Sequence, residues 1–482
     1  MGRRLTRRQL LRHAGLVAAT FPLARVSRPE WALAQEAAPG AGDLAAVPHN
    51  LELVTVTDTE MVVTWFTGDP SMPDEYGRPT PVQAPGRLLL GTAPNPLEWE
   101  VVAQHEPTAY HYARVSNLQP GTRYFFRAES NGVPAVPTQV SPLQPDPSNG
   151  GTFTTLTTPG GRELLRVAWM NDLHIGEHVS GLAYSDDRMP GGGFPPGYRV
   201  DEENPYWRFM AQGAIAGARS HGCRLLLANG DLTSGAELEG LVEAREHFDG
   251  FGRLGGPGGS GSMVRPDSPH AYFVTRGNHD RAHRGDHCSP VPDHPDLRDC
   301  FADVFADGFE RGTTRFSVLA GDDRARYRFV GLDSSEIATG AGQLPTEELE
   351  YLEAELERGD ATITMFHHHV GDRATFASVP PLTFGVNQED GRRFRELLAR
   401  HDNVAGVYNG HTHRNHRSTS TETGHLPYFE GASTKEYPGG YTVVRLFESG
   451  YMVNFWKTAT PDALAWSERS RGEYLGLYPY YT

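Results

Sequence analysis

The feature of this sequence that most constrains its fold is a series of five short apolar segments, each of which ends in polar residues. The segments alternate with amphipathic stretches of helical periodicity, a pattern typical of an α/β sheet. Because ligand sites in such sheets lie beyond the carboxyl ends of the strands, we expect the polar residues to converge. In chain order these residues are Asn171-Asp172-Leu173-His174, Gly230-Asp231, Asn278-His279-Asp280, His367-His368-His369 and Gly410-His411-Thr412-His413.

The residue types at these segment ends suit a metal site without thiolate ligands. Asp, Asn and His provide oxygen and imidazole donors, which favour iron, manganese or zinc. In Asp172-x-His174 and His411-x-His413 the two side chains lie two residues apart, so on an extended segment they face the same side. The chain has three cysteines and no Cys-x-x-Cys pair, which disfavours a thiolate zinc site.

Residues 49–158 have an all-β pattern of short segments between turn signals, with no cluster of catalytic residue types. The stretch LQPGTRYFFRAES resembles a turn and strand of the fibronectin type III sandwich, and Trp65 fits the early core tryptophan of that family. A β-sandwich of another lineage is the alternative. The expected fold class is therefore α/β, with an all-β sandwich domain at 49–158 ahead of a domain at 162–482 that carries the convergent polar residues. In the latter we expect a helix over 204–222 with Asn204 as its N-cap.

The first 34 residues predict a twin-arginine signal peptide. The segment Thr6–Arg12 resembles the export motif, a moderately apolar stretch follows at 14–24, and Ala32-Leu33-Ala34 offers a cleavage site. A basic amphipathic helix or basic tail is the alternative. The apolar stretch is too short to span a bilayer, so stable membrane insertion is not expected. Residues 35–48 are expected to form a linker, and the mature protein is expected to be periplasmic, at the cell surface or secreted.

Charge and cysteine content narrow the expected partners and the redox compartment. The formal net charge of −16 disfavours partners bound through charge alone, so no nucleic-acid partner is expected. An anionic small-molecule substrate in a local cationic or metal-bearing pocket remains compatible with this charge. An extracytoplasmic location permits a disulfide between Cys288 and Cys300, while Cys223 is expected to be a buried free thiol. The oligomeric state does not follow from the sequence.

Taken in order, the five segment ends resemble the signature blocks of the calcineurin-like metallophosphoesterases over about residues 165–457. The resemblance implies two metal ions. One would bind Asp172, His174 and His413, the other would bind Asn278, His411 and one histidine of the 367–369 triplet, and Asp231 would bridge both. That histidine usually stands two residues before a proline, whose place Val370 takes here. The match selects His368, with His367 as the alternative.

The resemblance also implies catalytic roles for the two residues after Asn278. His279 would face the substrate and stabilise developing charge or protonate the leaving group, and Asp280 would hold the other ring nitrogen of His279. A metal-bound hydroxide would attack the phosphorus of a phosphate mono- or diester. Arg276 has two open interpretations, a phosphate clamp and a salt bridge. Irregular segments at 179–203, 281–314 and 370–388 are expected to form the pocket walls.

A β-sandwich ahead of such a domain also resembles the purple acid phosphatases, with two departures. That group has the motif Gly-Asp-x-x-Tyr, in which the tyrosine binds the ferric ion. Here the motif begins with Gly230-Asp231, and Ser234 stands at the position of the tyrosine. The first block is Asp-x-His instead of Asp-x-Gly, so no tyrosinate colour is expected. The competing hypothesis is a cell-surface binding protein that uses the sandwich and keeps a vestigial phosphoesterase site. The complete set of ligand positions argues against it.

Overall fold

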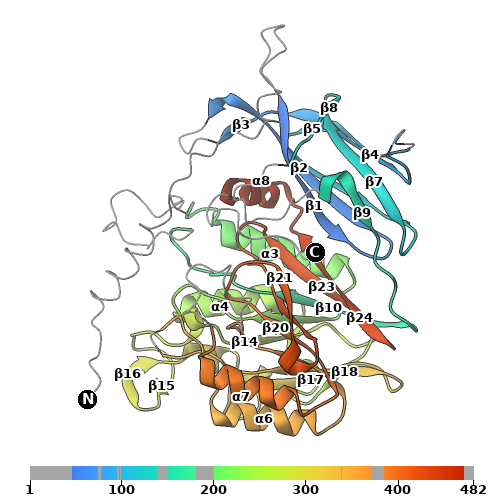
Figure 1. The fold of residues 1–482 in the computed structure, drawn as a ribbon. Coiled ribbons are helices and arrows are strands. Elements are labelled where there is room, and N and C mark those ends of the chain that lie inside the picture. The colour runs from blue at the N-terminus through green and yellow to red at the C-terminus, as the bar shows by residue number, and fades with distance from the viewer. Residues whose placement is uncertain are drawn as a thin grey trace. The chain divides into compact units, whose positions relative to one another are not determined.

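The computed structural model describes residues 46–73, 78–94, 97, 99–137, 149–180, 200–337, 339–370 and 385–471 (Figure 1). Residues 45–482 belong to one compact unit. The predicted signal peptide at 1–34, most of the linker at 35–48 and most of the segments at 179–203 and 370–388 lie outside the described residues. Within the described ranges, no helix is long and apolar enough to cross a membrane.

The amino-terminal strands form two antiparallel sheets. The first has the order β1-β2-β3, with β6 also paired to β2, and comprises β1 (Val47–Val56), β2 (Met61–Pro73), β3 (Pro79–Pro81) and β6 (Tyr110–Val115). The second has the order β5-β4-β7-β8, with β9 paired to β7, and comprises β4 (Ala84–Gly91), β5 (Trp99–Thr108), β7 (Arg123–Ser130), β8 (Val133–Pro134) and β9 (Thr152–Thr154). Leu88 and Phe126 from the second sheet share one core with Val63 and Trp65 from the first. This packing confirms the β-sandwich predicted from the sequence.

A polar histidine is built into the sandwich core. His111 is 1% exposed and stacks on Trp65, with the ring centroids 4.4 Å apart. Its Nε2 lies 3.0 Å from Thr67 Oγ1 and 3.2 Å from Ser130 Oγ, and Ser130 Oγ also accepts a hydrogen bond from Trp65 Nε1. Burial lowers the pKa of His111 to about 4, because the charged imidazolium loses its hydration there.

We therefore expect the sandwich to lose stability in mild acid. The folded state keeps His111 neutral down to about pH 4, whereas the unfolded chain takes up the proton near pH 6.5. The free energy of unfolding therefore has its full value above pH 6.5. It falls by up to about 3 kcal/mol as the pH drops toward 4. Urea unfolding of wild type and His111→Gln across this range isolates the effect. The difference in unfolding free energy should shrink as the pH falls, and a difference that stays constant from pH 7 to pH 4 contradicts the prediction.

The second part of the chain contains two larger sheets that face each other. One has the order β12-β14-β11-β10-β23-β24, and β10, β11, β12 and β14 run parallel. Its strands are β10 (Glu163–Met170), β11 (Leu225–Asn229), β12 (Arg253–Leu254), β14 (Ala271–Thr275), β23 (Gly440–Phe447) and β24 (Gly450–Lys457). β11 and β14 are buried along their whole length, as expected of parallel strands covered on both faces.

The facing sheet has the order β13-β17-β18-β19-β20-β22-β21, with β18, β19, β20 and β22 parallel. Its strands are β13 (Met263–Val264), β17 (Phe316–Gly321), β18 (Arg326–Gly331), β19 (Ala361–Met365), β20 (Val404–Asn409), β21 (His416–Ser420) and β22 (Leu426–Glu430). Trp169 of β10 joins the two sheets, because its ring stacks on Tyr408 of β20 at 3.9 Å between centroids. The predicted α/β class is confirmed.

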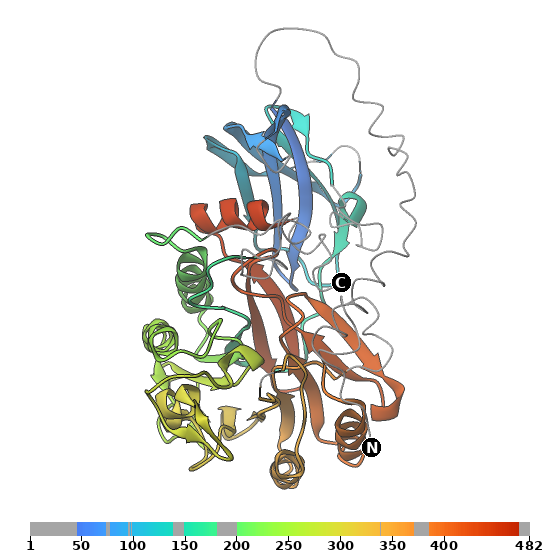
Figure 2. The same ribbon diagram turned by 90° about the vertical axis from the view of Figure 1, so that its left-hand side faces the viewer.

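Helices flank the two sheets in the described part of the chain. They are α3 (Tyr206–Ser220), α4 (Leu238–Asp249), α5 (Cys300–Val304), α6 (Thr346–Leu356), α7 (Gln388–Leu398) and α8 (Pro461–Ser470), with 3-10 turns at η1 (Asn149–Gly151), η2 (Asn278–Asp280), η3 (Ala306–Gly308) and η5 (Thr421–Thr423). α3 and α4 pack on the first sheet, whereas α6 and α7 pack on the second (Figure 2). Leu352 of α6 and Phe394 of α7 are buried in that second contact. The apolar residues of α6 and α7 recur three or four apart, as this packing requires.

The start of α3 corrects one sequence expectation. The N-cap is Pro205 and not Asn204. Pro205 has an extended backbone, and its carbonyl accepts the first helical bonds from the N–H groups of Arg208 and Phe209. The helix therefore begins one residue later than the Asn-Pro pattern predicts, and no side chain caps it.

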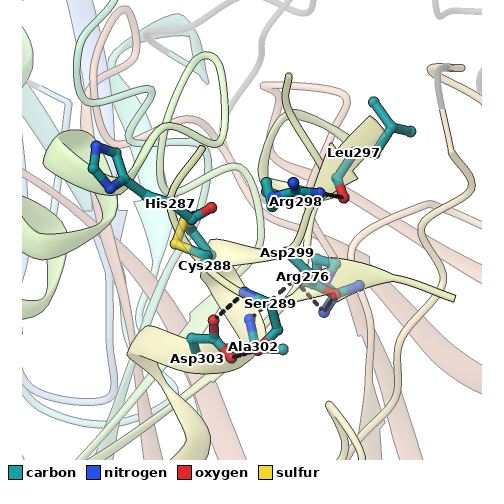
Figure 3. The surroundings of a disulfide bond; sticks show 10 residues. Arg276, His287, Cys288, Ser289, Leu297, Arg298, Asp299, Ala302 and Asp303 are labelled. Carbon is teal, nitrogen blue, oxygen red and sulfur yellow. Dashed lines mark hydrogen bonds and ion pairs between the residues drawn. A yellow bond between two sulfur atoms is a disulfide. The ribbon is translucent and has the colours of Figure 1, made fainter. Parts of the chain in front are cut away.

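A disulfide closes the loop after β14 (Figure 3). Cys288 and Cys300 are bonded across a hairpin of β15 (Pro290–Val291) and β16 (His294–Arg298), while Cys223 is a buried free thiol. Asp299 in this loop accepts two hydrogen bonds from Arg276 Nη2, at 3.1 and 2.9 Å. Arg276 also lies 3.4 Å from Asp333 and is 2% exposed. The geometry supports the salt-bridge interpretation of Arg276 over the phosphate clamp.

Candidate metal centre

The polar residues that follow the central strands adopt an unusual backbone. Five non-glycine residues there lie in the left-handed region, with φ of 52° at Asp172, 48° at His174, 49° at Asp231, 69° at His411 and 54° at His413. Each such residue costs about 1–3 kcal/mol and persists only where surrounding contacts impose it. Hydrogen bonds from Asp172 N to Gly230 O and from His174 N to Asp231 O tie the first two turns together. Strain concentrated at the ends of several strands is typical of a functional site.

Asp172, His174 and His413 form a first ligand group. Their donor atoms lie within 4.8 Å of one another, and all three residues are buried. His413 Nε2 is 3.4 Å from Asp172 Oδ1 and 3.3 Å from His174 Nε2. One carboxylate oxygen and two imidazole nitrogens thus converge, as a transition-metal ion requires.

Asp231, His367 and His411 form a second ligand group, again with donor atoms within 4.8 Å of one another. His367 Nε2 lies 3.1 Å from Asp231 Oδ2 and 3.1 Å from His411 Nδ1. The Oδ2 atom of Asp231 is also 3.7 Å from His174 Nε2 in the first group. Asp231 therefore lies between the groups, where the resemblance placed a bridging ligand.

The histidine triplet differs from the first choice made on the sequence. The second group contains His367, and not His368. The Nδ1 atom of His368 faces Ser334 Oγ at 2.9 Å, whereas His367 Nδ1 donates to the carbonyl of Asn229 and leaves Nε2 toward Asp231. β19 ends at Met365, and successive residues beyond it face different sides. The geometry thus favours the alternative residue, His367.

The surroundings of the Asn278 side chain indicate whether a metal ion fits this set of ligands. Asn278 is the first residue of η2, three residues after the end of β14, and its Oδ1 atom is buried without a hydrogen-bond partner. An unpaired buried amide oxygen is costly unless another group satisfies it. A cation at the second group would do so, because an amide oxygen is a neutral metal ligand. The residues present therefore fit a pair of metal ions.

Two glycines permit the close packing of these turns. A Cβ atom on Gly277 would lie 2.1 Å from the backbone nitrogen of Asp231, and one on Gly230 would lie 2.4 Å from His367 Nδ1. Gly230 also has a φ of 83°, which favours glycine. Larger residues at either position would displace Asp231 or His367.

His279 and Asp280 do not form the pair predicted from the sequence. The ring Nδ1 of His279 donates to the carbonyl of Ser234 at 2.9 Å. The carboxylate of Asp280 instead accepts from the backbone N–H groups of Leu232, Thr233 and Gly277, at 3.0, 2.8 and 3.1 Å. Asp280 is thus a brace between the Asp231 and Asn278 turns. His279 is exposed, and its ring lies 4.7 Å from that of His174.

The electrostatics of the site attract positive charge. Burial lowers the pKa of His367 and His413, but neighbouring carboxylates outweigh it. Asp231 and Asp172 raise the pKa of His367 to about 9, and Asp172 and Glu436 raise that of His413 to about 10. Burial and the nearby cationic side chains lower the pKa of His174 and His411. Metal ions would replace the two protons that these carboxylates hold on the imidazoles.

Several groups around the ligands carry no sequence signal. Glu436 accepts the ring N–H of His413 at 2.6 Å, the Asn229 carbonyl orients His367, and the Ser234 carbonyl orients His279. Two of these are backbone atoms, which no residue pattern reports. Glu436 stands in the stretch GASTKEYPGG, which has no metal-site spacing. Only the tertiary contact reveals it.

Comparison with known proteins identifies two families along the chain. Residues 47–143 match the family described as purple acid phosphatase, N-terminal domain, and residues 165–415 match calcineurin-like phosphoesterase. No curated protein sequence matches the chain significantly.

Solved structures similar to this one include three phosphatases or related proteins. A purple acid phosphatase from yellow lupin (Lupinus luteus) seeds is 15% identical, with 86% of this chain and 73% of that chain covered and a TM-score of 0.38. A dimetal phosphatase from Danio rerio is 11% identical, with 62% and 98% covered and a TM-score of 0.42. PhoD is 11% identical, with 86% and 90% covered and a TM-score of 0.36.

Proposed function

The chain belongs to the calcineurin-like phosphoesterase family and is a metal-dependent phosphoesterase, and from this premise we propose an exported enzyme that hydrolyses phosphate mono- or diesters with two metal ions. The observation that supports the two-metal proposal is the pair of ligand groups that share Asp231. A binding protein with a vestigial site would have lost some of these ligands, and every predicted position is filled.

We assign one ion to the first ligand group and the other to His367, His411 and Asn278, with Asp231 shared. The donor set suits iron, manganese or zinc. Two such ions would supply Lewis acidity toward phosphate oxygens and would lower the pKa of coordinated water. The protein holds them in place through the strained turns and through the carbonyl and carboxylate groups that fix each imidazole.

His279 is the group that we assign to the leaving oxygen. Because the Ser234 carbonyl can only accept, the Nδ1 atom of His279 carries a proton, and Nε2 carries one only in the imidazolium form. The exposed cation can therefore donate from Nε2 to an oxygen on which charge develops. Asp280 contributes indirectly, because it holds the two turns that carry Asp231 and Asn278.

We propose that the leaving group enters a pocket lined by the loop that follows His279 in the sequence. A pocket of about 580 Å³ begins at Arg281, two residues beyond His279, and includes Arg284, His294 and Gln343. The disulfide-closed loop provides one wall and the segment after β18 provides another. This pocket supports the expectation that residues 281–314 contribute to substrate binding.

Export rests on the amino-terminal sequence, where a twin-arginine segment, an apolar stretch and Ala32-Leu33-Ala34 follow in order. We expect the exported protein to begin just after Ala34. Mass spectrometry of the amino terminus checks this, and an intact Met1 in the extracytoplasmic fraction contradicts it.

The proposed activity is tested with paired chromogenic esters, p-nitrophenyl phosphate and bis-p-nitrophenyl phosphate. Purified protein is assayed with manganese, zinc and iron, then with chelator, and again after metal is restored. We expect turnover of at least one ester that chelator abolishes and metal restores, and the preferred ester separates phosphatase from phosphodiesterase. Absence of turnover for both esters, in protein shown to bind two metal ions, contradicts the proposal for simple esters.

A further inference from the structure

A buried segment after β22, residues 432–438, runs between the first ligand group and the amino-terminal sandwich, and we call it the strap. Its residue Glu436 is 0% exposed, and its Oε1 lies 2.6 Å from Nδ1 of His413. A carboxylate on the outer nitrogen of a ligating histidine fixes the tautomer and the ring orientation and makes the imidazole a stronger ligand. With the Nδ1 proton held in this way, His413 presents Nε2 to Asp172 and His174.

The strap also supports the turn that carries Asp172. Ser433 Oγ donates to the carbonyl of Asp172 at 2.9 Å, and the N–H of Thr434 donates to the carbonyl of Asn171 at 2.9 Å. Both residues are fully buried. The strap thus contacts two of the three residues of the first ligand group, one through its backbone and the other through its ring.

The other end of the strap is attached to the sandwich. Tyr437, next to Glu436, donates its hydroxyl hydrogen bond to Glu52 on β1 at 2.6 Å. Glu52 is 0% exposed and also pairs with Lys457 at 3.1 Å and with Arg471 at 2.5 Å. A buried ion cluster of this kind holds its members firmly, because removing one partner leaves an uncompensated charge.

We propose that Glu436 is a positioning residue for the metal ligand His413, and that the sandwich sets its position through Glu52 and Tyr437. This inference rests on the proposed two-metal function. Under this proposal the sandwich contributes to catalysis indirectly, by positioning Glu436, although it contributes no metal ligand among the described residues. The direct contacts of the strap are to Asp172 and His413, so we expect the coupling to act on the first ligand group.

The test measures zinc affinity in two backgrounds, each with one ligand group disabled. His367→Ala leaves the first group, and His174→Ala leaves the second. In the His367→Ala background, Glu436→Ala should weaken zinc binding by roughly 10- to 100-fold, and Glu436→Gln, which keeps an acceptor oxygen, should weaken it less. Tyr437→Phe, which removes the hydroxyl bonded to Glu52 and Arg471, should weaken it by about 3- to 10-fold. In the His174→Ala background the same changes should leave the zinc affinity unaltered.

Tyr327→Phe is the matched control for Tyr437→Phe. Its hydroxyl donates to the carbonyls of Phe447 and Gly450, away from the strap. Thermal unfolding with chelator checks that each variant folds. Equal losses in both backgrounds, or wild-type zinc affinity for Glu436→Ala in the His367→Ala background, would overturn the inference while the two-metal proposal stands. A wild-type protein that binds no metal would overturn both.

Discussion

Replacing Asp231 by Asn is expected to empty the metal centre and to lower turnover by more than about 10³-fold. The loss of one electrostatic stabiliser commonly costs 10²- to 10³-fold, and Asp231 serves two metal positions at once. Its Oδ2 lies 3.1 Å from His367 Nε2 and 3.7 Å from His174 Nε2, and the residue is 1% exposed. Asparagine has nearly the same shape but lacks the charge. Buried cations would then lack the anion that compensates their lost hydration.

The measurement is metal content per chain by mass spectrometry, together with kcat. Asp360→Asn is the control, because Asp360 is a paired carboxylate outside the site, bound to Arg326 at 2.7 Å. It should retain two ions per chain and near wild-type kcat. Two tightly bound ions and wild-type turnover in Asp231→Asn would show that Asp231 is not the shared ligand.

Replacing His279 by Ala is expected to lower turnover without loss of metal, unlike the change at Asp231. Both metal ions should be retained, and turnover should fall by about 10²- to 10⁴-fold for esters of poor leaving groups. The ring of His279 donates to the Ser234 carbonyl and belongs to neither ligand group. The loss should be smaller for p-nitrophenyl esters, since p-nitrophenolate leaves without a proton. A ratio of kcat values that depends on the leaving group therefore separates proton donation from simple charge stabilisation.

His287→Ala is the matched control for this prediction. His287 is an exposed histidine immediately before Cys288 of the disulfide (Figure 3). Its removal should leave both kcat and the leaving-group dependence unchanged. Loss of metal from His279→Ala would contradict the assigned role, because it would place His279 among the ligands.

The parts of the site that the sequence predicts are those encoded within single segments. Asp172, Asp231, Asn278 and His411 each stand two or three residues after a strand of one of the two facing sheets, and the carboxyl ends of these strands lie at the site. A bridging position for Asp231 followed only from the family resemblance. The contacts in the structure agree with it.

The parts that the sequence does not predict depend on single-residue register and on distant contacts. The triplet offers three equivalent side chains, and only the exit of the chain from β19 selects His367 over His368. Asp280 follows His279 in sequence, yet backbone N–H groups almost fifty residues away compete successfully for its carboxylate. Glu436 reaches His413 across 23 positions of chain with no local pattern.

The most direct test of the two-metal claim is a titration of metal-free wild-type protein with zinc or manganese while hydrolysis of the preferred ester is recorded. We expect turnover to remain low through the first equivalent of metal and to reach its maximum at two equivalents per chain, because the two ligand groups act on one phosphate. Full activity at one equivalent, or activity in the metal-free protein, would contradict the account.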